Sequence, residues 1–351
     1  MKKWLIGVLC LALCAIGVWG AMRLVRLLTA DATRYNYVVL EDGTTRITSY
    51  KGGASTLQIP SKLDDHPLSA IGEKAFFWNI MLTDVTIPQG VENIDEGAFM
   101  GCWNLAGVAI PEGVSSVGAK AFAECQALKQ VSLPRSLIAL GDEAFGECTA
   151  LTEIALPDGV ASVGGNPFRD CPRLERVIVS EDHPALVLVD GALFGRDDGR
   201  LIWYPRTLEA SEYSVPEGTT LIGDAAFSGC RRLSRVALPE GLSAIGDNAF
   251  HGCASLKDAV IPRGVARVGN LAYADCAALE AVSLPEGLRE IGYLAFYNCR
   301  HLTTLDIPDS VTYIGEGAFI GCPELALTVS RGSRAEVYCG LYELPFSYRD
   351  E

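Results

Sequence analysis

A unit of 23 residues repeats along most of the chain and constrains its fold more than any other feature. Each unit reads P-x-[GS]-[VL]-x-x-[IVL]-G-x-x-A-F-x-x-C-x-x-L-x-x-V-x-[IL]-P. The prolines that open the regular units are Pro88, Pro111, Pro134, Pro157, Pro216, Pro239, Pro262, Pro285 and Pro308. A fixed period of this length is typical of a solenoid, because each unit can bury its apolar face only against its neighbours.

The pattern within one unit predicts its local structure. The segment L-x-x-V-x-[IL]-P alternates in its second half and indicates a short strand, with Val108 and Ile110 pointing inward in one unit. Proline ends the strand, because it cannot donate to a sheet ladder. The Ala-Phe pair predicts a tight helical turn whose ring fills the core. We therefore expect an α/β solenoid, with parallel strands stacked ~4.8 Å apart as a curved sheet on one face and helical turns on the other.

Interruptions of the repeat divide the chain into segments. We expect a transmembrane or signal segment over 1–30, an N-terminal cap hairpin with a first irregular repeat over 31–87, regular repeats over 88–179, a hairpin island over 180–215, regular repeats over 216–325 and a C-terminal cap over 326–351. Apolar strands around an Asp-Gly turn predict both hairpins. Caps are expected because the end of a solenoid exposes an unpaired strand edge and an open core.

The N-terminus predicts a membrane segment. Residues 4–22 are uncharged and lie between a Lys-Lys pair and two arginines, Arg23 and Arg26. Their length approaches the ~20 residues that span a bilayer, and it also fits a long signal-peptide core. The absence of a small-x-small cleavage site at the end of the run favours a retained anchor; if the segment is cleaved, the protein is secreted. The charges that flank the run are nearly balanced, but the Lys-Lys start favours a body outside the cell.

The charge of the chain excludes one class of partner. The net charge is −14, and residues 1–26 contribute four basic residues and no acidic one. The rest of the chain therefore carries a formal charge of about −18. A body this acidic is repelled by phosphate backbones, so we expect no nucleic acid partner.

The cysteines are predicted to be structural. Nine of them stand in register: Cys102, Cys125, Cys148, Cys171, Cys230, Cys253, Cys276, Cys299 and Cys322. No C-x-x-C spacing of the kind used by zinc sites occurs among them. Disulfides between neighbouring coils are conceivable, but the number is odd and Asn79 occupies the same column. We predict buried free thiols that pack in the core.

No catalytic constellation emerges from the other polar residues. The four histidines are His66, His183, His251 and His301; they are scattered, and we expect ordinary surface positions for them. The acidic pairs at 142–143 and 197–198 lie on predicted turns, where solvated acids are normal. We therefore predict a protein that is not an enzyme and that holds no cofactor or metal.

Two sets of exposed residues are candidates for binding. The first set lies on the strands and is predicted to form a concave face: Asp84, Thr86, Gln130, Ser132, Glu153, Arg176, Arg235, Asp258, Thr304 and Asp306. This face is polar and lacks aromatic residues, which suits a broad protein contact; the alternative is a face that merely meets water. The second set is aromatic: Tyr293, Tyr297, Tyr313 and Trp203. Tyr and Trp are enriched in binding hot spots, although Trp203 also suits packing within the island hairpin.

The registered repeat resembles the BspA-type leucine-rich repeat family over about residues 35–346. It departs from the ordinary leucine-rich repeat, which has Asn after the strand, where this chain has residues such as Gly113 and Ser136. The resemblance implies a protein of the surface of bacteria or parasitic protists, several of which act in adhesion to host matrix proteins or other cells. We expect a non-catalytic, surface-displayed protein that binds other proteins. The alternative is a structural scaffold of the cell envelope that organises other membrane proteins.

Overall fold

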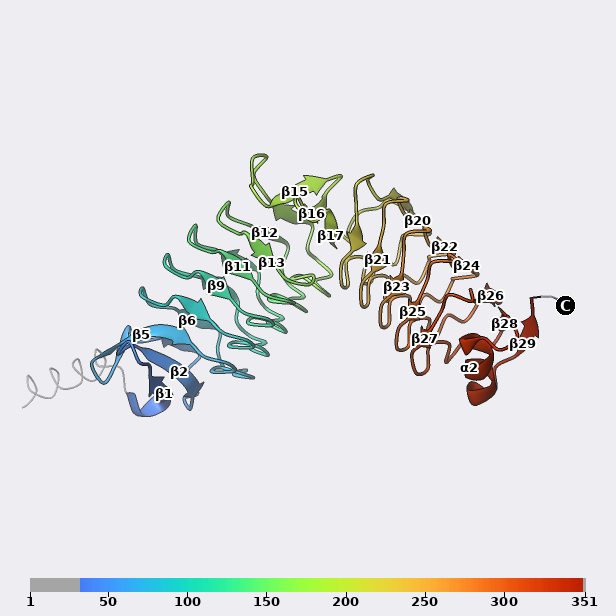
Figure 1. The fold of residues 1–351 in the computed structure, drawn as a ribbon. Helices are drawn as coiled ribbons and strands as arrows, with labels where there is room; N and C mark the ends of the chain where they lie inside the picture. Colours follow the sequence, from blue (N-terminus) through green and yellow to red (C-terminus); the bar gives the residue numbers. More distant parts are fainter. Residues whose placement is uncertain (1–31, 350–351) are drawn as a thin grey trace, which may run out of the picture.

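The computed structural model describes residues 32–349, which form a solenoid bent into an arch (Figure 1). The membrane segment predicted within residues 1–30 lies outside the described residues. Among residues 32–349, no helix is both long enough and apolar enough to cross a membrane.

The first described residues form a cap in which an antiparallel strand pair is followed by parallel strands. Its elements are η1 (Ala32–Arg34), β1 (Tyr35–Val39), β2 (Thr45–Tyr50), β3 (Thr56–Gln58), β4 (Lys62–Leu63) and β5 (His66–Ile71). Strand β1 pairs antiparallel with β2, and β2 pairs in parallel with β5. The cap therefore covers the open end of the core and presents a parallel edge on which the repeats stack.

Each regular coil contributes two strands. The three-residue strands are β6 (Asp84–Thr86), β8 (Gly107–Ala109), β10 (Gln130–Ser132), β12 (Glu153–Ala155), β14 (Arg176–Ile178), β18 (Glu212–Ser214), β20 (Arg235–Ala237), β22 (Asp258–Val260), β24 (Ala281–Ser283) and β26 (Thr304–Asp306). The two-residue strands are β7 (Asn93–Ile94), β9 (Ser116–Val117), β11 (Ala139–Leu140), β13 (Ser162–Val163), β19 (Leu221–Ile222), β21 (Ala244–Ile245), β23 (Arg267–Val268), β25 (Glu290–Ile291) and β27 (Tyr313–Ile314). Pairing is parallel and keeps the repeat register, as in Val85 opposite Val108. The sequence predicted the first series and missed the second.

The expected helical turns are absent from the repeats, and the α/β prediction is corrected to a β-solenoid. In the Ala-Phe segment the N–H groups alternate between two partners. The N–H of Phe77 bonds to Lys74 O within the coil (3.1 Å), whereas that of Phe76 bonds to Ala98 O in the next coil (2.7 Å). Left-handed residues such as Lys74 (φ 53°) make this alternation possible. A helix cannot form, because half of its N–H donors leave the coil; the α-helix of the described chain, α2 (Arg334–Tyr342), belongs to the C-terminal end.

The island interrupts the stack with an antiparallel meander. Its strands are β15 (Leu186–Val189), β16 (Ala192–Gly195) and β17 (Arg200–Trp203). Strand β17 pairs in parallel with β19, which starts a second sheet of two-residue strands. We call the coils before the island the N-terminal stack and those after it the C-terminal stack. The apolar core is divided at the same place into two clusters.

Aromatic rings fill both clusters. Neighbouring rings lie face to face in the N-terminal stack from Phe76 to Phe145 and in the C-terminal stack from Phe227 to Phe319, with centroids 4.8–5.8 Å apart. The cysteine column runs beside the rings. Eight of the nine thiols in the column, all but Cys230, donate to the carbonyl of the aromatic residue one coil earlier, as Cys125 does to Phe99 O (3.4 Å). All ten cysteines of the described residues are free and buried, which confirms the predicted packing of the ladder.

The C-terminal end closes the core with β28 (Ala326–Val329), α2 and β29 (Phe346–Tyr348). Ser333 caps α2 by accepting the N–H of Glu336 through its hydroxyl (3.2 Å). Tyr338 of this helix packs edge-on against Phe319, the last ring of the ladder (5.9 Å). The helix therefore covers the open core where the repeats end.

Candidate protein-binding surfaces

The polar residues predicted as contacts lie on the three-residue strands, and we call this surface the strand face. All of them are exposed except Asp258, which is half-buried. Figure 1 draws β20, β22 and β24 toward the outer side of the arch, with β21, β23 and β25 toward its inner side. The strand face is therefore not concave in the C-terminal stack.

The structure does not bring the strand-face residues together into one site. The three-residue strands form separate short sheets, and the island lies between β14 and β18. Three of the charged side chains form ion pairs. Arg176 pairs with Glu153 of the adjacent strand, and Asp306 accepts from Arg349 at 2.7 Å. The face is a row of exposed polar groups, three of which are held in ion pairs, and it suits a shallow contact better than a pocket.

A second surface gathers exposed rings on two adjacent coils. Tyr293, Tyr297 and Tyr313 are all exposed, and so is Ile320. Tyr297 and Ile320 occupy the same column, because the N–H of Asn298 bonds to Ile320 O (2.8 Å). We call these four residues the tyrosine patch. It combines exposed aromatic side chains with a backbone that is hydrogen-bonded from coil to coil.

A ladder of side-chain acceptors fixes the backbone at Tyr293. Oδ1 of Asp224 accepts the N–H of Asp247 (2.8 Å), Oδ1 of Asp247 accepts the N–H of Asn270 (2.9 Å), and Oδ1 of Asn270 accepts the N–H of Tyr293 (2.9 Å). We call this the Asx ladder. The sequence analysis did not predict this ladder. The signal was an Asp or Asn directly after the repeat glycine in three successive units.

The environment of Asp247 favours its charged form. Burial alone would raise the pKa of this carboxyl, but the hydrogen bonds from the backbone and side chain of Asn270 and the pairing with Arg267 outweigh it, so the pKa lies below its usual value. The guanidinium of Arg267 reaches Asp247 at 2.7 Å and Glu290 at 3.2 Å. The ion-paired Asp247 therefore anchors the ladder two coils before Tyr293 of the tyrosine patch.

Trp203 is not available for contact. Only 3% of its surface is exposed, and its ring packs edge-on against Phe168, with centroids 6.2 Å apart. Its prediction as an aromatic contact is wrong, and the alternative of packing within the island hairpin holds. Trp203 lies on the face of the island hairpin that packs against the N-terminal core cluster, so its ring is buried there.

The four histidines contact backbone groups or lie near carboxylates of neighbouring coils. His183 is buried, which corrects its expected surface position: Nδ1 accepts the N–H groups of Ala185 and Leu186, and Nε2 donates to Pro157 O (3.0 Å). His66 contacts Gly43 O (2.9 Å), while the other two histidines lie near carboxylates of the following coil. Within residues 32–349, no group of three or more His, Cys, Asp or Glu side chains is placed to hold a metal.

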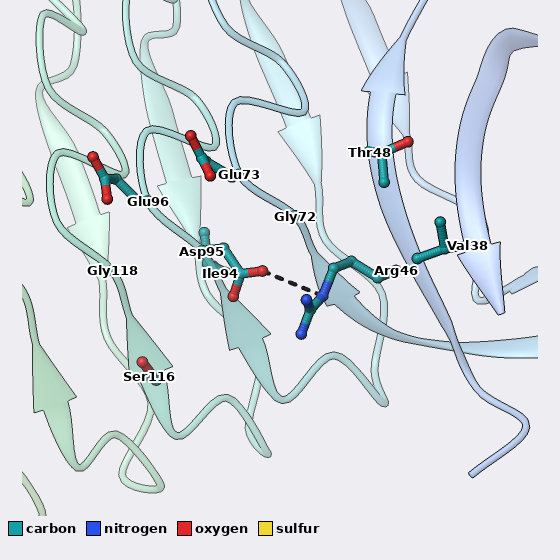
Figure 2. A pocket seen from close by; sticks show the side chains of 10 residues that line it. All are labelled: Val38, Arg46, Thr48, Gly72, Glu73, Ile94, Asp95, Glu96, Ser116 and Gly118. Carbon is teal, nitrogen blue, oxygen red and sulfur yellow. Dashed lines mark ion pairs between the residues drawn. The ribbon is translucent and has the colours of Figure 1, made fainter. Parts of the chain in front are cut away.

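An open pocket of about 540 Å³ lies between the cap and the first coils (Figure 2). Asp95 lines this pocket and stands in the column that holds Gly72 and Gly118 in the flanking coils. Its carboxylate pairs with Nε of Arg46 (3.3 Å). Burial raises the pKa of Asp95, and Arg46 offsets part of that effect. Figure 2 shows the carboxylate of Glu73 on a loop beside this pair. The lining mixes charged and polar side chains with apolar ones, whereas typical small-molecule sites have a mostly apolar lining.

A further exposed surface was missed by sequence reasoning. Phe77, Trp78, Ile80 and Met81 of the first coil are all exposed. We call them the apolar patch. The signal was present as a run of large apolar residues outside the core columns of the repeat.

The fold and the repeat agree with comparisons to known proteins. Residues 69–186 and 204–326 match the model of the BspA type leucine rich repeat region, in six copies, which is more than half of the chain. The chain is similar to the crystal structure of a leucine-rich cell surface protein from Faecalibacterium prausnitzii A2-165, with 28% identity, a TM-score of 0.67 and coverage of 88% of this chain and 96% of that one.

A second solved structure shares the fold. The pneumococcal vaccine antigen PcpA is 23% identical, with a TM-score of 0.61 and coverage of 84% of this chain and 79% of that one. No curated protein matches the sequence.

Proposed function

Because the chain belongs to the BspA-type leucine-rich repeat family, we propose that it is a non-catalytic surface protein whose solenoid binds other proteins. The similar protein from Faecalibacterium prausnitzii is described as a cell surface protein, and that description supports the same location here. A repeat family supplies a scaffold rather than a ligand, so the binding site must be argued from exposed side chains.

The tyrosine patch carries this proposal. Its rings are large, exposed and mounted on backbone that is bonded to both neighbouring coils. Tyr is over-represented among residues that dominate binding energy, because its ring buries much area at a low cost in side-chain entropy. The strand face then supplies polar contacts around a larger footprint, as the rim of a protein interface does.

We further propose that residues 4–22 anchor the protein in the membrane with its body outside the cell, as the Lys-Lys pair before the uncharged run favours. In this arrangement the solenoid adheres to host matrix proteins or to proteins of neighbouring cells. The alternative is a scaffold that organises other proteins of the same envelope. The two differ in the origin of the partner, which is outside the cell in the first and in the same membrane in the second.

Binding measurements with the full-length chain in vesicles test the proposal. A panel of matrix proteins and surface proteins from neighbouring cells is compared with membrane proteins from the same cell. The variant Tyr293→Ala/Tyr297→Ala should weaken binding to the selected partner by about 30-fold or more, since a hot spot contributes about 2 kcal/mol or more. Ile138→Ala, an exposed apolar residue of another coil, serves as the matched control and should change affinity less than about twofold.

Equal affinity of the double tyrosine variant and the wild type would contradict the assignment of the patch. A partner drawn only from the same membrane would favour the scaffold.

A further inference from the structure

The first coil exposes large apolar side chains beside the place where the chain enters the solenoid, and we propose that this apolar patch seats that end of the protein on the surface of a lipid bilayer. The exposed fractions are 45% for Phe77, 49% for Trp78, 42% for Ile80 and 57% for Met81. Contiguous exposed apolar side chains of this kind mark a contact surface. The inference rests on the proposed membrane anchor.

The patch is held in a fixed shape by the second coil. The ring of Trp78 lies 5.0 Å from that of Trp103 and 6.0 Å from that of Phe77. It also covers Gly101, where a Cβ would come within 2.7 Å of the indole. The backbone N–H of Trp78 bonds to Met100 O (2.8 Å). The patch is therefore pre-formed, and its exposure does not depend on a flexible loop.

The chain enters the solenoid next to this patch. Arg34 O accepts the N–H of Lys51 (2.8 Å), and the adjacent Tyr50 donates its N–H to Ala75 O (2.8 Å). Two hydrogen bonds thus connect the first described turn to the segment that carries Phe77. Only nine residues, 23–31, separate this turn from the uncharged run at 4–22, and even a fully extended linker of that length spans about 30 Å. An anchor in the bilayer keeps the patch close to the lipid surface.

The chemistry of the patch matches the interface of a bilayer. Tryptophan prefers the headgroup level, and Phe, Ile and Met can enter the boundary of the acyl chains. Exposed Lys51 and Lys74 flank the patch, and Lys74 is paired with Glu73 (2.7 Å), so this pair adds no net negative charge beside it. The tyrosine patch lies on β27 and on the turns that follow β25 and β27, in the opposite arm of the arch (Figure 1). Docking through the first coil leaves that patch free for a partner.

Tryptophan quenching in vesicles tests this inference with the full-length chain. The protein is reconstituted into phosphatidylcholine vesicles whose acyl chains are brominated near the headgroup. Trp4→Phe/Trp19→Phe is used as the background, because it removes the tryptophans of the uncharged run and leaves Trp78, Trp103 and the buried Trp203. Adding Trp78→Phe should reduce the quenched fraction of fluorescence by at least about half, since Trp78 is the most exposed of the three.

A second variant keeps the reporter and changes its surroundings. Phe77→Ser/Met81→Ser in the same background should reduce quenching of Trp78, whereas Ile138→Ser, on a distant coil, should not. If the chain floats with the vesicles but the background is quenched no more than its Trp78→Phe variant, the inference fails and the anchor stands. If the chain does not float with the vesicles, the anchor fails and so does the inference. Crosslinking of two copies through the patch, without quenching, would also overturn the inference in favour of self-association.

Discussion

Asn166 donates a hydrogen bond from Nδ2 to the carbonyl oxygen of Ala225, at 2.8 Å, although 59 residues separate the two positions. The same side chain accepts the N–H of Phe168 through Oδ1 (3.0 Å), and only 5% of Asn166 is exposed. Asn166 lies in the last coil before the island and Ala225 in the first regular coil after it. The bond therefore joins the two stacks at the place where the aromatic core divides.

Removing this link should destabilise the protein more than removing a similar bond elsewhere. Asn166→Ala leaves the buried N–H of Phe168 without a partner and removes the bond between the stacks, although Ala225 O still accepts the N–H of Ser228 (3.1 Å). The loss should cost about 1–3 kcal/mol. Asn104→Ala is the matched control, because the exposed Asn104 also donates to a carbonyl of another coil, Ile80 O, at 2.7 Å. The control should cost about 0.5 kcal/mol or less. Denaturant unfolding followed by circular dichroism measures both, and equal costs would show that Asn166 does not join the stacks.

Gly292, which precedes Tyr293 at the end of the Asx ladder, is required by the close approach of two coils. A Cβ at Gly292 would lie 2.5 Å from the backbone N of Asn270, so Gly292→Ala forces the coils apart and should cost about 1–3 kcal/mol. Gly340→Ala should instead stabilise the protein. Gly340 lies in α2 with open space around it, and alanine there should add about 0.5–1 kcal/mol. Thermal unfolding of the two variants measures both changes in stability. A Gly292→Ala variant as stable as the wild type would contradict the close packing of the two coils.

The Asx ladder predicts a specific loss of stability in acid. Because the pKa of Asp247 is lower in the folded protein than its usual 3.8, its contribution is complete above that value and is lost as the pH falls through the folded pKa. Asp247→Asn keeps an oxygen for the N–H of Asn270 but cannot ionise. The free energy of unfolding should therefore fall less steeply in the variant than in the wild type between about pH 6 and pH 3. Identical slopes would show that Asp247 is not stabilised in its charged form.

The cysteine ladder should be inert while the protein is folded. Burial raises the pKa of Cys102 and Cys253 to about 12, so at pH 8 only about one molecule in 10⁴ carries a given thiolate. In a Cys10→Ser/Cys14→Ser variant, which removes the two cysteines outside the described residues, the thiols whose pKa is raised should not react with a thiol reagent over minutes. The hydrogen bond with Cys299 instead lowers the pKa of Cys322, so Cys322 is the one thiol of the column that can react earlier. Ten thiols should react after denaturation. Rapid reaction of several thiols in the native protein would mean that the core column opens to solvent.

The sequence was most informative where one residue type fills one column of the core. The repeat predicted the stack, the burial of Phe122 and its equivalents, and the packing of the thiols, because a column accepts only side chains of matching size and polarity. The Ala-Phe turn was mispredicted as helical because its decisive hydrogen bonds, such as Phe76 to Ala98, join residues one coil apart, beyond any local pattern. Local spacing reports contacts within a coil, and half of the turn's donors are used between coils.

The candidate surfaces were harder to predict for a related reason. Exposed columns are under no packing constraint, so their residues vary from coil to coil and form no pattern. Trp203 was proposed as a contact because its position in the island lies outside the repeat, and only the three-dimensional structure shows that Phe168 covers it. The apolar patch was visible as a run from Phe77 to Met81, but its exposure depends on how the first coil stacks on the cap.

The location of the solenoid can be measured by protease shaving of intact cells that express the full-length chain. This experiment tests whether the solenoid is displayed on the cell surface. Added protease should remove the body of the protein from intact cells while a cytoplasmic marker survives. Survival of the body on intact cells, together with its cleavage after lysis, would contradict surface display and the adhesive function proposed from it.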